Sequence, residues 1–233
     1  MKAFVFSLAA AAPLLLGACS SEQEPAPKTR AERSPATMGQ RTLVAAGLSA
    51  QSLGPKIVGP QGPEVSSEIS LEGQPVARMV SYVACPAPAE GEAAAEECVP
   101  ADMPASTIYT YVHRITSTGA DTEAQPFAFR TTRPASGFAK VIGYDRLQAE
   151  STLGHDYTIG VAEDAGLLIW RIEAGDGWGE GEELTFFWQS TMPPAGPAEA
   201  FEVQSYTGTA DLTGPFPAPE KPAGEAGTGS ASR

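Results

Sequence analysis

The sequence predicts an all-β protein: a single antiparallel β-sandwich of about 7–9 strands, preceded by a disordered N-terminal tether and followed by a disordered tail. Two observations carry this prediction. Short runs of β-branched and aromatic residues recur along the middle of the chain, and clusters rich in Gly and Pro separate them. A chain of 233 residues is long enough to bury one core of ordinary size without a metal.

The expected strands follow one another at short intervals, and period-two alternation assigns their faces. The segments are 69–71, 76–84, 108–115, 126–132, 138–144, 157–162, 166–173, 183–191 and 200–207, with turns at 117–121, 134–137, 163–166 and 192–196. A short helical turn is expected only at 146–151. The predicted core consists of Phe127, Phe129, Ile159, Val161, Leu168, Trp170, Ile172, Leu184, Phe186, Trp188, Phe201 and Val203.

Composition divides the chain into four parts. Residues 1–18 form a signal peptide, 19–56 a Ser-, Pro- and Ala-rich tether, 57–213 the β-sandwich domain, and 214–233 a disordered Pro-, Gly- and Ala-rich tail. The two flanking parts contain few large apolar residues, so neither can bury enough surface to order itself.

The N-terminal residues have the arrangement of an export signal. Lys2 precedes an apolar run at 3–16 that is too short to span a bilayer, and the run ends Leu16-Gly17-Ala18-Cys19. These last four residues resemble the lipobox of bacterial lipoprotein signal peptides. The resemblance implies cleavage before Cys19, a diacylglycerol thioether and palmitate-type acylation at Cys19, and a lipid-anchored envelope protein. Because Ser20 rather than Asp follows, it also implies the outer membrane, facing the periplasm or the surface. An ordinary secretory signal is the alternative.

Charge excludes some partners. The net charge is -13 and the pI about 4.5, which disfavours binding to nucleic acid or to anionic headgroups. Residues 57–213 hold 23 acidic and 7 basic side chains. Arg130 and Arg133 are a basic pair within this acidic segment. Neighbouring carboxylates neutralise the pair, or the pair receives a carboxylate of a partner.

Two cysteines remain after Cys19. Cys85 and Cys98 form an even pair in an oxidising compartment, so we expect a disulfide that closes the acidic loop between them. Their spacing is not the CxxC of redox enzymes.

No catalytic residues are predicted. The chain has no GxSxG, GxGxxG or P-loop pattern and only two histidines. We expect His113 to be a half-buried strand residue, and neither histidine to take part in catalysis. No zinc signature or cofactor motif occurs either.

One loop, 173–183, has the composition of a ligand site. Its acidic residues alternate with glycines, and oxygen ligands in such a loop can surround Ca²⁺. An exposed Trp178 beside Asp176, Glu180 and Glu182 would also suit stacking and hydrogen bonding to a glycan. The alternatives are a solvated hairpin loop and a Trp178 that folds back over the sandwich edge.

The expected function is therefore that of a non-enzymatic, lipid-anchored envelope protein whose domain is a binding or structural component for another envelope protein. The alternative function is a glycan- or Ca²⁺-binding module centred on Asp176, Trp178, Glu180 and Glu182.

Overall fold

A computed structural model describes residues 40–89, 91, 96–119 and 125–219 of the chain. The signal peptide, Cys19 and most of the expected tether and tail lie outside these residues. The elements in chain order are β1 (Arg41–Thr42), β2 (Ala46–Gly47), η1 (Leu48–Ala50), β3 (Leu53–Lys56), β4 (Val65–Leu71), β5 (Gln74–Pro86), η2 (Pro100–Asp102), β6 (Tyr109–Ser117), β7 (Ala128–Thr131), β8 (Phe138–Tyr144), α1 (Arg146–Leu153), β9 (Thr158–Asp164), β10 (Leu167–Ala174), β11 (Glu183–Ser190), β12 (Pro194–Gln204) and β13 (Thr209–Pro217).

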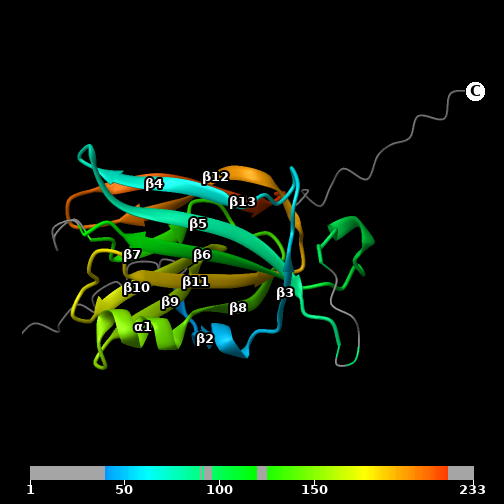
Figure 1. Cartoon of the computed structure of the whole chain (residues 1–233), viewed down its shortest axis with the longest axis horizontal. Coiled ribbons are helices and arrows are strands. Elements are labelled where there is room, and N and C mark those ends of the chain that lie inside the picture. Colours follow the sequence, from blue (N-terminus) through cyan, green and yellow to red (C-terminus); the bar gives the residue numbers. More distant parts are fainter. Residues whose placement is uncertain (1–39, 90, 92–95, 120–124, 220–233) are drawn as a thin grey trace, which may run out of the picture. The chain divides into compact units, whose positions relative to one another are not determined.

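The strands form two sheets that pack as a sandwich, which confirms the predicted fold class (Figure 1). The first sheet has the order β1-β9-β10-β7-β12-β13. The second has the order β2-β8-β11-β6-β5-β3, with β4 also paired to β5. All strand pairs are antiparallel except β2, which runs parallel to β8.

The folded region extends beyond the expected 57–213 domain at both ends. β1, β2 and β3 lie within the expected 19–56 tether, and β13 continues into the expected tail as far as Pro217. β1 and β2 contain two residues each, too few for alternation to be visible in the sequence. The described residues consequently form more strands than the sequence predicts.

Turn chemistry and a helix cap explain why several elements end where they do. Glu72 and Gly73 join β4 to β5 with positive φ of 50° and 79°, the conformation of a type I′ hairpin turn. Ala165 and Gly166 join β9 to β10 in the same way. The Asp145 side chain accepts a hydrogen bond from the Gln148 backbone N–H and caps the start of α1. The helix continues to Leu153, beyond the end of the expected 146–151 turn.

The core fills the space between the sheets, and most of the predicted core residues lie in it. Trp170 and Trp188 are fully buried, and Phe129 stacks on Phe201 with ring centroids 5.6 Å apart. Two predicted core residues are only partly buried: Ile172, which packs against the core, and Phe127, which lies outside the core cluster. Cys85 and Cys98 form the predicted disulfide, with Cα atoms 6.1 Å apart.

Candidate functional site

The 173–183 loop does not present the expected stacking platform. Trp178 is 2% exposed and belongs to the hydrophobic core. The Gln125 side-chain amide holds the Trp178 backbone at both its N–H and its C=O. The ring face needed for a sugar is therefore covered, and Trp178 folds over the sandwich edge, the alternative that the sequence left open.

The carboxylates of this loop also do not assemble into a Ca²⁺ site. Glu182 accepts a hydrogen bond from the backbone N–H of Gly179 within the loop, whereas Asp176 lies against Gly154 at the end of α1. Within the described ranges, no three His, Cys, Asp or Glu side chains come close enough to hold a metal ion. The loop carboxylates lie apart because alternate residues on a turning backbone point in different directions.

Arg130 and Arg133 have different environments. Arg130 forms an ion pair with Glu202, with a guanidinium N to carboxylate O distance of 2.7 Å. The Arg133 guanidinium carbon lies 5.6 Å from the Phe216 ring centroid, and one of its nitrogens donates to the Glu199 backbone carbonyl at 3.2 Å. No carboxylate among the described residues lies within 4.0 Å of that guanidinium.

Arg133 borders a groove with a volume of about 670 Å³. The β7–β8 connection, the start of β8, the end of β9 and the end of β13 form its walls. We call it the Arg133 groove and define it by Arg133, Ser136, Phe138, Lys140, Glu163 and Phe216.

A charged cluster closes one side of this groove. Lys140 donates to both carboxylate oxygens of Glu163, at 3.0 and 3.3 Å, and Arg41 from β1 contacts the same carboxylate at 3.3 Å. The hydrogen bond from Lys140 and that from Arg41 hold the pKa of Glu163 below its ordinary value, although burial opposes the shift. Lys140 and Arg41 thus share one carboxylate, and Arg133 lines the same groove without an ion pair to a described residue, so basic side chains outnumber acidic ones here.

The backbone of β8 places Lys140 here at some cost. Opposite β11, Phe138 pairs with Ser190 and Ile142 with Trp188, so β8 bulges between these residues. Lys140 lies within the bulge at a φ of +62°, a conformation that residues other than glycine rarely adopt. The bulge also brings its ammonium to 5.0 Å from the Phe138 ring centroid. Strain of this kind is common where a side chain has a role beyond packing.

A second cluster, Ser81 and His113, has the residue types of a nucleophile and its base, but neither side chain is accessible to a substrate. His113 Nδ1 lies 2.9 Å from Ser81 Oγ, and Trp188 Nε1 donates to His113 Nε2 at 3.3 Å. Since Nε2 is the acceptor, the neutral ring carries its proton on Nδ1. Both residues are 0% exposed, so His113 is fully buried and not half-buried as the sequence suggested, and burial lowers its pKa to about 3. This pair stabilises the core and cannot meet a substrate.

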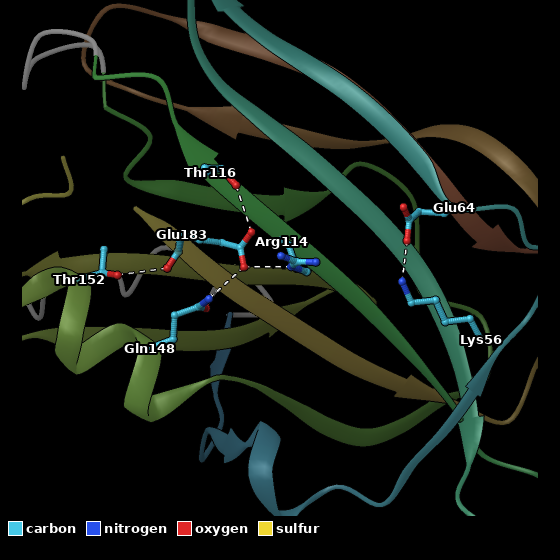
Figure 2. A network of polar contacts seen from close by, with 7 residues as sticks. All are labelled: Lys56, Glu64, Arg114, Thr116, Gln148, Thr152 and Glu183. Carbon is cyan, nitrogen blue, oxygen red and sulfur yellow. Dashed lines mark hydrogen bonds and ion pairs between the residues drawn. The ribbon is translucent and has the colours of Figure 1, made fainter. Parts of the chain in front are cut away.

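A third polar network lies on the outer face of the second sheet (Figure 2). Glu183 accepts hydrogen bonds from Arg114, Thr116 and Gln148, and Thr152 of α1 donates to the Glu183 backbone carbonyl. The network attaches α1 to β11 and β6. The hydrogen bonds of the Glu183 carboxylate all come from neighbouring strands and α1, so we interpret the network as structural, although the buried Gln148 Oε1 has no hydrogen-bond partner among the described residues.

Nearby on the same face, Lys56 pairs with Glu64 at 2.6 Å, and its ammonium lies 4.1 Å from the Tyr82 ring centroid (Figure 2).

Comparison with known proteins adds no relative: no family model, curated protein or solved structure matches the chain. None of the helices in the described ranges is both long and apolar enough to cross a bilayer.

Proposed function

We propose that the protein is a lipid-anchored, non-enzymatic component of the bacterial envelope that binds an extended segment of another envelope protein in the Arg133 groove. The segment carries a carboxylate beside apolar residues. The observation that carries the proposal is the Arg133 guanidinium, which is held over Phe216 without a carboxylate partner in the described part of the chain.

The shape and chemistry of the groove support this proposal. Its volume of about 670 Å³ falls within the range of ligand pockets, roughly 300–1,000 Å³. Phe138 offers apolar surface, Phe216, which is 3% exposed, supports the Arg133 guanidinium, and Arg133 can bind a carboxylate with two parallel hydrogen bonds. The rest of the domain is negatively charged and repels acidic segments, so such a segment should bind at the Arg133 groove and not at other surfaces.

The membrane part of the proposal depends on Cys19. The lipobox resemblance supports acylation there, and two or three acyl chains hold a protein stably in a bilayer. Replacing Cys19 by Ser should leave a full-length precursor without label from radioactive palmitate. Normal processing of the C19S chain would contradict the anchoring.

Groove binding is tested by photo-cross-linking in intact cells. A photoreactive amino acid at Thr191, an exposed residue lining the groove, should capture one dominant protein. The same probe at Ser70, near the opposite end of the sandwich, should not capture it.

Two charge-matched variants make this experiment selective. Arg133→Gln should abolish the cross-link from Thr191, whereas Arg130→Gln, three residues away and already paired with Glu202, should leave it. Equal capture from Ser70, or equal loss in both arginine variants, would overturn the proposal.

A further inference from the structure

The last described residues of the chain run along the Arg133 groove. Phe216, Pro217 and Pro219 all line it, and β13 ends at Pro217. Pro219 is exposed and is the last residue that the structure describes. The segment that follows Pro219 therefore begins at the groove to which the proposed function assigns a partner.

This segment has the chemistry that the groove accepts. Residues 217–222 read Pro-Ala-Pro-Glu-Lys-Pro, so Glu220 is the first carboxylate after the residues that line the groove. Pro217, Pro219 and Pro222 favour an extended backbone and reduce the conformational entropy that is lost when the segment is held. The segment is thus an acidic, proline-rich peptide that is already attached to the site.

The groove offers this carboxylate an arginine without a carboxylate partner in the described ranges. The Arg133 guanidinium lies over the Phe216 ring and donates one hydrogen bond to the Glu199 carbonyl, which leaves other N–H groups for an anion. Four residues of chain join Phe216 to Glu220 and span at most about 14 Å when extended. The Glu220 carboxylate can therefore reach the guanidinium that rests on Phe216.

The N-terminal tether is a less suitable source of the carboxylate. β1 brings Arg41 to Glu163, but Gln40, the one described residue before Arg41, does not line the groove. The first carboxylate before Gln40 is Glu32, several residues away, whereas Glu220 directly follows a residue of the groove wall. A shorter connection gives a higher effective concentration at the site, in the millimolar range for short flexible chains.

We propose that Glu220 of the same chain occupies the Arg133 groove when no partner is bound, so that the segment after Pro219 is an autoinhibitory peptide which the partner must displace. The Glu220 carboxylate accepts hydrogen bonds from Arg133, as the carboxylate of the partner does in turn. The contact itself depends only on this chain, whereas the regulatory part rests on the proposed function.

The Arg133 Nε–H resonance reports the contact in the full chain, purified alone in detergent. Glu220→Gln removes the charge next to the groove, and Glu225→Gln removes an equal charge five residues further along the chain. Glu220→Gln should shift the Arg133 resonance and leave that of Arg130, which is paired with Glu202, in place. Glu225→Gln should shift neither. An Arg133 resonance that responds equally to both variants, or to neither, would overturn the proposal.

A second copy of the chain is the competing source of the same carboxylate. Isotope-labelled Glu220→Gln chain is mixed with increasing amounts of unlabelled wild-type chain. For an intramolecular contact, the Arg133 resonance of the labelled chain should stay at its own position at every ratio. A return toward the wild-type position would show that the segment binds another copy and would overturn the intramolecular contact.

The cross-link from Thr191 in intact cells tests the regulatory part. Exposed ion pairs favour the paired state roughly 1.5- to 5-fold, so loss of the pair should raise the fraction of free grooves about two- to sixfold. Glu220→Gln should increase capture of the partner by that factor, and Glu225→Gln should leave capture unchanged. Equal capture in the two variants would overturn the autoinhibition. Capture of no partner in any variant would count against the proposed function alone, because the NMR contact needs no partner.

Discussion

Lowering the pH from about 7.5 to about 5 should destabilise the protein by about 2 kcal/mol through His113 alone. The pKa of this buried ring falls to about 3 in the folded chain, whereas in the unfolded chain it returns to the ordinary value of about 6.5. Below about pH 6.5 the unfolded chain binds a proton at His113, whereas the folded chain leaves that ring neutral. Stability is therefore complete above about pH 6.5 and is lost as the pH falls toward 3.

The magnitude follows from the gap between the pH and the pKa of the unfolded chain. At about pH 5 that gap is about 1.5 units, and each unit corresponds to about 1.4 kcal/mol. The result does not depend on the folded pKa as long as it stays below about 4. Ser81, Trp188, Phe129 and Phe201 surround the ring, and none of them carries a charge that could hold the proton.

Two carboxylates limit the pH range over which His113 alone accounts for the change in stability. The pKa values of Glu163 and Glu183 are also lowered in the folded chain, Glu163 mainly by hydrogen bonding to Lys140. Burial opposes the shift at Glu183, and hydrogen bonds from Arg114 and Thr116 outweigh it. Their contribution is present above the ordinary carboxyl value and is lost below it, so it adds to the effect only under more acidic conditions.

The assay is urea unfolding of the full chain, followed by tryptophan fluorescence at several pH values. His155→Gln is the control: it removes the other histidine, whose side chain is 89% exposed, and leaves His113 in place, so the loss of about 2 kcal/mol should persist. An NMR titration of the His113 ring complements it. A stability that stays constant from about pH 7.5 to about pH 5, or a His113 ring that titrates near 6.5 in the folded chain, would refute the reasoning.

Two pairs of substitutions test the strand arrangement. Gly143→Ala should destabilise the fold by about 1–3 kcal/mol and remove amide protection from β2, because a Cβ at Gly143 would lie 2.0 Å from the Ala46 carbonyl oxygen. Gly160→Ala meets only the end of a flexible glutamate side chain and should cost much less in the same urea and hydrogen-exchange measurements; equal costs would contradict the β2–β8 pairing. Lys140→Gly should be more stable than Lys140→Ala by about 1 kcal/mol, the reverse of the usual order in strands, because Gly accepts the positive φ. The usual order, with Ala more stable, would refute a strained bulge.

The strands that alternation predicted are those with long runs of apolar residues on one face. Leu184, Phe186 and Trp188 illustrate this: their period-two spacing required one buried face, and the structure buries all three. β2 shows the limit of the method. Its two residues, Ala46 and Gly47, have no pattern of their own and are held by pairing with β8.

The structure buries the Trp178 ring, as the fold-back interpretation expected and the ligand-site hypothesis did not. The local sequence could not decide between the two, because it does not show distant partners. The flanking glycines suggested exposure, but Gln125, far away in the chain, fixes the Trp178 backbone, and the ring packs into the core. The exposed ring of Tyr206 was not predicted either, although the turn sequence Ser-Tyr-Thr-Gly that contains it was a usable signal. Turn residues face solvent more often than strand residues do.

The Arg133 groove could not be located from a motif, because four separate parts of the chain build it. Its location also determines which part of the protein must be used in experiments. Arg41 contributes through Glu163, and Phe216 forms part of the floor, yet both lie outside the 57–213 segment that composition suggests as the domain. A fragment cut at those boundaries would lose β1, β2, β3 and the end of β13, and with them the groove. Failure of such a fragment to bind a partner would therefore reflect the missing walls, and only the full chain can decide whether the groove binds.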